Sequence, residues 1–184
     1  MDDEYIDIVT ELGEVTGRKA LKSEIHTNGY FHNTAHIWLY TKDGCVLLAQ
    51  RAASKSICPL LWDVSVAGHV DAGELIIHAA LREVKEEIGL HLTPNDLQKI
   101  GVFDCFQSYA NGIKDNEFHH TYIAELKVPL EKLIPQKGEV EALKLVTFKA
   151  FKKLLNQIGE NNHFVASNKP YYQFVLDCIM QISN

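Results

Sequence analysis

The sequence lacks several features that mark particular protein classes. Its four cysteines (Cys45, Cys58, Cys105 and Cys178) form no C-x-x-C pair, so neither a zinc knuckle nor a disulfide framework is indicated. No run of three or more consecutive lysines or arginines occurs, and the formal net charge is -6. A nucleic-acid polymer and an anionic membrane surface are therefore not expected as partners.

Long apolar runs are missing as well. No stretch approaches the roughly 18 apolar residues of a membrane span. The N-terminus, MDDEYIDIVTELGE, is acidic and has no apolar core of the kind that a signal peptide carries. We expect a cytoplasmic protein. At 184 residues, with 46% hydrophobic and 23% charged residues, the chain is typical of one globular domain with a sizeable core.

The hydrophobic pattern predicts strands and helices in mixed order. The predicted strands cover residues 5–9, 20–25, 36–40, 46–49, 62–67, 100–109, 118–126 and 143–148. One predicted helix begins at Leu75, and two more cover residues 149–158 and 169–182. Residues 51–61 and 110–116 are predicted loops. This order indicates an α/β fold with a mixed β-sheet sandwiched between helices.

The predicted domain boundary lies near residue 28. Residues 1–28 are expected to form a β-hairpin or arm packed on a main domain of residues 29–184. This arm and the last predicted helix are the candidate surfaces for a homodimer. The sequence does not choose between a monomer and a dimer.

The most informative stretch is residues 68–90, GHVDAGELIIHAALREVKEEIGL. From Leu75 onward, apolar residues recur at helical spacing, while Glu83, Glu86 and Glu87 lie three and four positions apart on another face. Like charges at these spacings are unfavourable unless water solvates them or a cation neutralises them. The choice between a solvated face and a cation site depends on the exact spacing.

That spacing is G-x5-E-x7-R-E-U-x-E-E-x-G-U, where U is apolar, and every specified position is matched. Seven identities at background frequencies coincide by chance on the order of once in a hundred million windows. This pattern is the Nudix box. The chain therefore resembles the Nudix hydrolases, MutT-like pyrophosphatases that cleave a diphosphate linked to another moiety by attack of water on phosphorus, and the resemblance implies a Nudix fold.

The resemblance implies roles for the box residues. Glu83, Glu86 and Glu87 would bind Mg²⁺ or Mn²⁺, cations that prefer oxygen ligands. One of these glutamates, or a carboxylate from another loop, would position or deprotonate the attacking water.

Four other box positions are expected to support the metal ligands. Glu74 and Arg82 would form an ion pair that orients the ligands. Gly68 would let the main chain approach the metal closely, and Gly89 would end the helix where φ turns positive.

Motifs outside the box resemble one branch of the family, isopentenyl-diphosphate isomerase and its hydrolase-like relatives. They are HNTAHIWLY from residue 32, LLAQR at 47–51, CPLLW at 58–62 and GH at 68–69, and DNE at 115–117 matches a later E-x-E element. Arg51, which ends the LLAQR motif, is expected to bind the substrate.

The same branch suggests a second group of ligands. In the isomerases, the first histidine, the histidine after the glycine or serine, and the E-x-E carboxylates hold a metal. Carried over by position, these are His32, His69, Asp115 and Glu117, with His26 as a nearby further histidine. Glu117 is in addition a candidate catalytic carboxylate.

Two departures separate the chain from the isomerases. The isomerases carry a cysteine immediately before the glycine or serine, where this chain has Ala67. The box of the isomerases is degenerate, whereas the box of this chain is complete. Both departures favour hydrolysis of a small nucleoside or organic diphosphate over isomerisation. Isopentenyl-diphosphate isomerase and a non-catalytic nucleotide- or metabolite-binding module stay open as alternatives.

Overall fold

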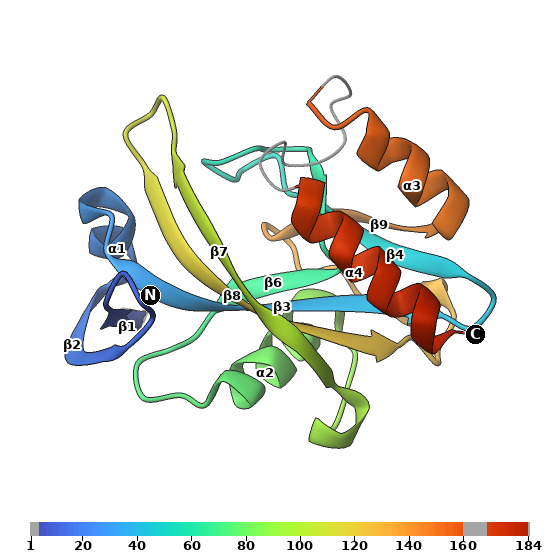
Figure 1. Cartoon of the computed structure of the whole chain (residues 1–184), viewed down its shortest axis with the longest axis horizontal. Helices are drawn as coiled ribbons and strands as arrows, with labels where there is room; N and C mark the ends of the chain where they lie inside the picture. The colour runs from blue at the N-terminus through green and yellow to red at the C-terminus, as the bar shows by residue number, and fades with distance from the viewer. Residues whose placement is uncertain (1–3, 160–168, 184) are drawn as a thin grey trace.

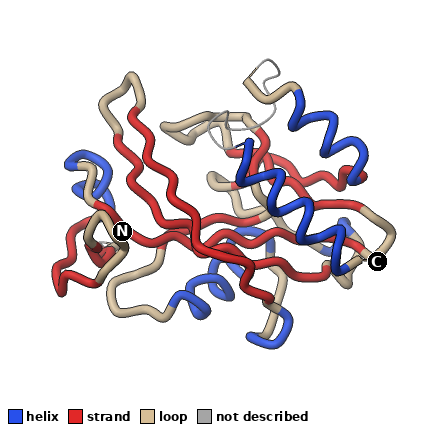
Figure 2. The backbone as a smooth tube through the Cα atoms, viewed as in Figure 1, coloured by secondary structure: helices blue, strands red, loops and turns tan. Residues whose placement is uncertain are grey.

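A seven-stranded mixed β-sheet forms the centre of the molecule, and helices cover both of its faces (Figures 1 and 2). The computed structural model describes residues 4–159 and 169–183. Its strands are β1 (Tyr5–Val9), β2 (Val15–Leu21), β3 (Phe31–Thr41), β4 (Cys45–Arg51), β5 (Trp62–Asp63), β6 (Val66–His69), β7 (Gln98–Ser108), β8 (Lys114–Glu125) and β9 (Val140–Thr147). Its helices are α1 (Lys22–Asn28), α2 (Ile76–Ile88), α3 (Phe148–Asn156) and α4 (Lys169–Ile182), with short 3₁₀ turns η1 (Pro94–Asp96) and η2 (Leu130–Lys132).

The central strand β3 divides the sheet in two. Along one side it runs parallel to β8, and on the other side it pairs with β6 in its first half and with β4 only at its end, at Tyr40 and Thr41. The strands β4 and β6 therefore diverge from each other. Where they part, the buried Ser65 hydroxyl accepts from the Leu39 amide (2.8 Å) and donates to the Leu47 carbonyl (2.7 Å), which satisfies backbone groups that no strand partner reaches.

Alternating residues of β3 serve the two faces of the sheet. Ala35, Ile37 and Leu39 belong to the core beneath α2. Trp38 and Tyr40 belong to a second core beneath α3 and α4. This two-residue period confirms the expected arrangement of a sheet between helical layers.

The N-terminal hairpin packs on the loop that leads into α2. Ile6 forms a bridge with Asp71, and the Ala72 amide donates to the Tyr5 carbonyl (2.8 Å). The prediction of a strand over residues 20–25 is wrong at its end, because α1 begins at Lys22. There Glu24 accepts the Leu21 amide at 3.2 Å, which caps the new helix.

Two other predicted boundaries also differ. The strand predicted over residues 62–67 is divided into β5 and β6. Ser65 lies between them, and its hydroxyl group bonds to the main chain of both β3 and β4. The loop predicted over residues 110–116 is shorter, because a tight turn closes through Gly112 (φ +86°) and the Tyr109 amide donates to the Ile113 carbonyl. Asp115 and Glu117 thus lie inside β8 and not in a solvated loop.

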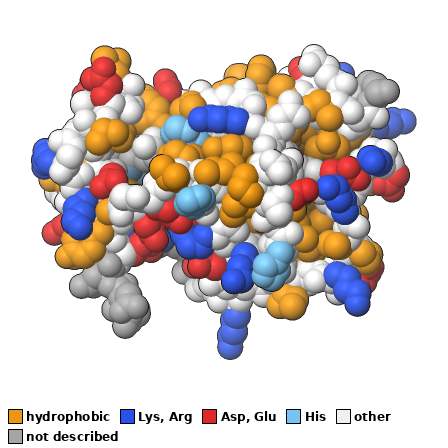
Figure 3. Space-filling view, turned by 90° about the horizontal axis from the view of Figure 1, so that it is seen from below, with side chains coloured by type: hydrophobic (Ala, Val, Ile, Leu, Met, Phe, Trp, Pro, Cys, Tyr) orange, Lys and Arg blue, Asp and Glu red, His pale blue; other side chains and the backbone are white. Residues whose placement is uncertain are grey.

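Figure 3 shows one face of the molecule, on which acidic and basic side chains are interspersed beside histidines and a group of apolar side chains. That face carries no large field of a single sign. Of the helices within the described residues, none is both long and apolar enough to cross a membrane.

Candidate active site

A small, open cleft lies where β4 and β6 diverge. One wall comes from β6 and α2, and the opposite wall comes from β4, β5 and the segments that follow β4 and precede β9. The polar or charged side chains that line it are Gln50, Arg51, Lys55, Asp63, Glu87 and Glu139. The cleft therefore brings Arg51 of the LLAQR motif and Glu87 of the box to one place.

The main chain of β6 lies directly against α2. At Gly68 a Cβ atom would overlap the carboxyl carbon and both oxygens of Glu83. The φ angle of Gly68 is not in the left-handed region, so glycine is required by the close approach of the carboxylate and not by a turn. Glu83 is accordingly buried, with 9% of the residue exposed.

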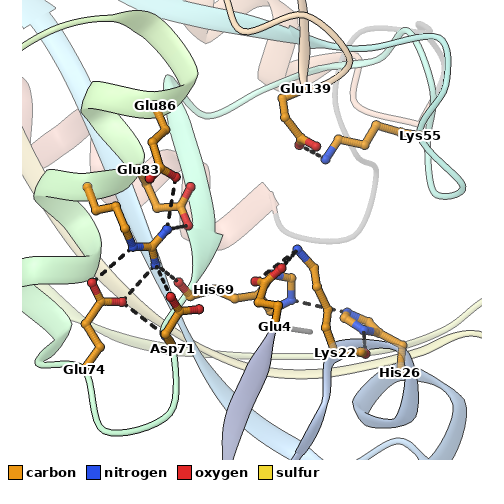
Figure 4. A network of polar contacts seen from close by, with 11 residues as sticks. Glu4, Lys22, His26, Lys55, His69, Asp71, Glu74, Glu83, Glu86 and Glu139 are labelled. Carbon is orange, nitrogen blue, oxygen red and sulfur yellow. Dashed lines mark hydrogen bonds and ion pairs between the residues drawn. The ribbon is translucent and has the colours of Figure 1, made fainter. Parts of the chain in front are cut away.

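Arg82 connects most of the box carboxylates. Figure 4 labels its partners Glu74, Glu83 and Glu86. Its Nε and Nη2 donate to the two oxygens of Glu74 at 3.1 and 2.9 Å, the expected ion pair. Its Nη1 donates to Glu83 (2.7 Å) and Glu86 (3.3 Å), and Nη2 also donates to the carbonyl of His69 (3.0 Å). One guanidinium therefore ties the loop, β6 and α2 together.

The wall formed by α2 disfavours the ionised form of its buried carboxyl groups. Burial, and then the neighbouring Glu83, raise the pKa of Glu87 to about 8. Burial also raises the pKa of Glu83, although Arg82 opposes this rise. The three box glutamates do not place their oxygens at one point, since Glu83 and Glu86 contact Arg82 while Glu87 faces the cleft. A cation bound there would favour the ionised form of each carboxylate.

The opposite wall carries Arg51, which the sequence predicted as a site residue, and Lys55, which it did not. Lys55 forms an ion pair with Glu139 (Figure 4). Arg51 donates from Nε to the Ile57 carbonyl (3.0 Å) and places Nη1 at 3.8 Å from Asp63. The only local sequence signal for Lys55 as a site residue is its position four residues after Arg51, because its partner Glu139 lies far along the chain.

A second cluster lies next to the box, at the other end of β6. Nitrogen and carboxylate atoms of His26, His32, His69 and Glu117 all lie within 4.8 Å of one another. They come from α1, β3, β6 and β8, and Asp115 of β8 adjoins them at 3.4 Å from His26 Nε2. The structure therefore brings together all five residues that the resemblance suggests.

The cluster contains unused ligand atoms. His32 Nδ1 donates to the Tyr30 carbonyl (3.0 Å), which leaves Nε2 as the acceptor nitrogen. This buried Nε2 has no hydrogen-bond partner, and neither does the buried Oδ1 of Asp115. Glu117 Oε1 lies 3.6 Å from His32 Nε2. Orphaned nitrogen and oxygen atoms that face one another suit a divalent cation.

Electrostatics in the cluster follow from burial and from Glu117. Burial alone would lower the pKa of His32, but the nearby carboxylate of Glu117 outweighs it and raises that pKa. Burial, followed by the charge of Lys22, holds the pKa of His69 well below its usual value. For Glu117, burial is outweighed by the hydrogen bond of His119 and by the nearby His32, which hold its pKa well below the usual range. Glu117 is therefore ionised.

A family model described as the NUDIX domain matches residues 30–166. The chain belongs to the Nudix family. The resemblance that the box suggests is thus confirmed, and members of the family are hydrolases that act on diphosphates.

Curated relatives include both reaction classes of the branch. Nudix hydrolase 3 of Arabidopsis thaliana is 35% identical over 162 residues, which are 85% of this chain but only 21% of that protein. An uncharacterized Nudix hydrolase of Clostridium acetobutylicum is 37% identical, over 78% of this chain and 69% of that protein. The isopentenyl-diphosphate Delta-isomerase of Serratia proteamaculans is 31% identical, over 66% of this chain and 65% of that protein.

Solved structures confirm the Nudix fold. A Deinococcus radiodurans protein superposes with a TM-score of 0.70 at 20% identity, over 92% of this chain and 98% of that one. The Nudix domain of Shewanella oneidensis NrtR, solved with ADP ribose, superposes with a TM-score of 0.59 at 16% identity, over 80% and 87% of the two chains. The predicted α/β architecture is therefore correct.

Proposed function

We propose that this Nudix protein is a divalent-metal-dependent pyrophosphohydrolase that cleaves a small nucleoside or organic diphosphate by attack of water on phosphorus. One observation carries the proposal: Glu87 of the complete acidic box faces the cations Arg51 and Lys55 across one cleft. A diphosphate-cleaving site needs both the acidic box, which would hold a metal ion, and the basic side chains, because the phosphate oxygens bind cations and the reaction requires charge neutralisation at phosphorus.

The box residues divide the work on the acidic wall. Glu83, Glu86 and Glu87 would hold Mg²⁺ or Mn²⁺, with Gly68 giving the main chain room beside Glu83. When bound, such a cation supplies Lewis acidity to the phosphate oxygens and to the attacking water. Glu87, which faces the cleft, is the glutamate we assign to orient or deprotonate that water.

The support residues keep those carboxylates in place. Arg82 fixes Glu83 and Glu86 from behind and is itself aligned by both oxygens of Glu74. On the opposite wall, Arg51 and Lys55 would bind the outer phosphate oxygens. A bound diphosphate would compete with Glu139 for Lys55.

The histidine cluster is assigned to a second cation. His32, His69, Asp115 and Glu117, with His26, offer a mixed nitrogen and carboxylate set that suits Mn²⁺ better than Mg²⁺. The structure of a Francisella tularensis NMN adenylyltransferase/ADP ribose pyrophosphatase contains AMP and a manganese ion. That complex and the ADP ribose of the Shewanella structure support a nucleoside diphosphate as substrate class and Mn²⁺ as one usable cation.

The isomerase is the second candidate, because Cys105 of β7 pairs with Glu117 of β8 across the strands. This places a thiol in the strand register opposite the candidate carboxylate, although residue 67 is alanine. Incubation with isopentenyl diphosphate, followed by NMR, tests it directly. We expect no dimethylallyl diphosphate, and steady conversion would favour the isomerase.

A panel of diphosphates tests the proposal. We expect Mg²⁺- or Mn²⁺-dependent hydrolysis of at least one nucleoside diphosphate derivative, sugar nucleotide or organic diphosphate. Glu87→Gln is expected to lose more than about 100-fold in turnover, the size typical of a metal-site residue. The exposed Glu131→Gln, made as a control, should keep full activity. Binding of every diphosphate with turnover of none would favour the non-catalytic module.

We further propose a cytoplasmic protein whose residues 1–28 form an arm on a Nudix domain of residues 29–184. The arm contacts the loop before α2 through Ile6 and Tyr5. We propose a small-molecule diphosphate, and neither a nucleic-acid polymer nor a membrane, as the partner of the site. Light scattering of the purified protein distinguishes a monomer from a homodimer, and cell fractionation tests the location.

A further inference from the structure

Helix α4 carries two neighbouring buried tyrosines, Tyr171 and Tyr172, which are 6% and 3% exposed. Successive residues of a helix project about 100° apart, and the two hydroxyl groups reach different strands. Tyr171 contacts Trp38 of β3 and Thr121 of β8, whereas the Tyr172 hydroxyl donates to Asp63 of β5 at 2.9 Å. One helix therefore touches both sides of the divided sheet.

The hydroxyl of Tyr171 lies at the centre of a buried network. It accepts from Trp38 Nε1 at 2.9 Å and lies 3.2 Å from both His36 Nδ1 and Thr121 Oγ1. The Thr121 hydroxyl donates to the carbonyl of His119 at 3.2 Å. With the proton on His36 Nδ1, each of these polar atoms has a partner, and Tyr171 donates to Thr121.

This network ends at Glu117. The rings of His36 and His119 stack with centroids 3.8 Å apart and an angle of 20° between their planes. His119 Nε2 then donates to Glu117 Oε2 at 2.9 Å, while the other oxygen, Oε1, faces His32 of the cluster. The orientation of the Glu117 carboxylate thus depends on His119. The His119 ring stacks on His36 and its carbonyl accepts from Thr121, and both of these residues contact the Tyr171 hydroxyl.

His36, His119 and Glu117 also lie close enough together to be considered as a metal site. Their geometry opposes that assignment, because the nitrogen lone pairs of nearly parallel stacked rings do not converge on one point. The 2.9 Å contact between His119 and Glu117 is in addition an ordinary hydrogen-bond length. The triad therefore supports the carboxylate of Glu117.

Tyr172 reaches the anion-binding wall. Asp63 Oδ1 accepts from the Tyr172 hydroxyl (2.9 Å) and from the Val64 amide (2.8 Å). These two donors fix the carboxylate and leave Oδ2 directed to Arg51, at 3.8 Å from Nη1. Arg51 is thereby held at the edge of the cleft.

We propose that Tyr171 and Tyr172 are positioning residues, which act on the two halves of the site through separate connections. Tyr171 orients Glu117 of the metal cluster through His36 and His119. Tyr172 orients Arg51 of the diphosphate-binding wall through Asp63. Helix α4 thus sets both the metal ligand and the anion-binding arginine. The inference rests on the proposed function of the site.

Two conservative variants test it, Tyr171→Phe and Tyr172→Phe, each of which removes one buried hydroxyl group. Tyr171→Phe should weaken Mn²⁺ binding by about 10-fold, measured by electron paramagnetic resonance in a Glu87→Gln background so that the cluster dominates. Tyr172→Phe should leave Mn²⁺ binding unchanged and weaken methylenediphosphonate by about 5-fold in calorimetry, the loss expected for one hydrogen bond. Tyr122→Phe, on the α2 face, is the control.

Turnover provides an independent readout. Tyr171→Phe should lower kcat with KM unchanged, and Tyr172→Phe should raise KM with kcat unchanged. A purely structural role would move both parameters together in both variants, or neither, and that result would overturn the inference. Wild-type protein that hydrolyses no diphosphate would count against the proposed function, whereas the two binding measurements would still decide the inference.

A substitution of His119 tests the connection itself. His119→Gln keeps an N–H group near the position of Nε2, whereas His119→Leu removes the donor. We expect the glutamine variant to retain most Mn²⁺ affinity and the leucine variant to lose about 10-fold. Equal affinity in the two variants at equal stability would show that the bond to Glu117 does not position it.

Discussion

The carboxylate of Glu83 occupies the space that a side chain at residue 68 would fill. Gly68 thus permits the contact between β6 and α2 that brings the box glutamates to the cleft. The Gly68 position belongs to the strand and not to a turn, since its φ angle is not in the left-handed region. Any larger residue must displace either β6 or Glu83.

Gly68→Ala should therefore abolish metal-dependent turnover, since the new methyl group forces Glu83 away. We expect at least a 100-fold loss of kcat, a size seen when metal-binding geometry fails. Activity assays with circular dichroism would measure the effect and the fold together. Gly17→Ala in the N-terminal hairpin is the control for stability: its added Cβ meets no atom within 4 Å but its φ of +73° strains the backbone, so it should lose stability and keep turnover. Full activity of Gly68→Ala would contradict the role assigned to this contact.

Glu74 should make stability depend on acid pH. Burial would raise its pKa, but the hydrogen bond from Arg82 outweighs burial and lowers it. A carboxyl group whose pKa is lower in the folded state stabilises the protein above its unfolded pKa and loses that contribution as pH falls. Wild type should exceed Glu74→Gln by about 1–3 kcal/mol in urea unfolding at pH 7. The difference should shrink below about pH 4.5.

Glu131→Gln provides the matched comparison for Glu74→Gln, since Glu131 is exposed. The free energy of unfolding of Glu131→Gln should equal that of the wild type at every pH. A gap between wild type and Glu74→Gln that stays constant from pH 7 to pH 3.5 would exclude the ion pair with Arg82 as its source.

Metal removal should destabilise the protein through the histidine cluster. A cation that binds only the folded state raises the melting temperature in a concentration-dependent way. Mn²⁺ added to protein treated with a chelator should raise Tm in wild type, and His32→Phe should remove most of this shift. The exposed His91→Phe should keep it. Equal shifts in wild type and His32→Phe would place the stabilising cation elsewhere.

Local sequence patterns predict much of the fold. Helix α4 is observed over Lys169–Ile182 as its pattern indicates, and the Asp43-Gly44 turn joins β3 to β4 with Gly44 at φ +87°. Errors occur where tertiary contacts decide. Ile25 packs with Ile6 and Ile8 from a helix and not from a strand, although its apolar neighbours fit both.

In the candidate site, too, local motifs predict some contacts and tertiary packing decides the others. The bond between Glu74 and Arg82 follows from one short motif, and so does the helical placement of the box glutamates. Lys55 and Glu139 meet across 84 positions of the chain, and His36 and Tyr171 meet across 135. No local spacing encodes such pairs, because they depend on how β4, β9 and α4 pack.

The central claim is that water attacks phosphorus under control of the acidic box. The most direct measurement is hydrolysis of the preferred diphosphate in ¹⁸O-labelled water, with Mg²⁺ or Mn²⁺, followed by mass spectrometry of both products. We predict one ¹⁸O atom in a phosphate product for wild type, and no metal-dependent product for Glu87→Gln. Label at a carbon hydroxyl group, or unchanged turnover in Glu87→Gln, would contradict the account.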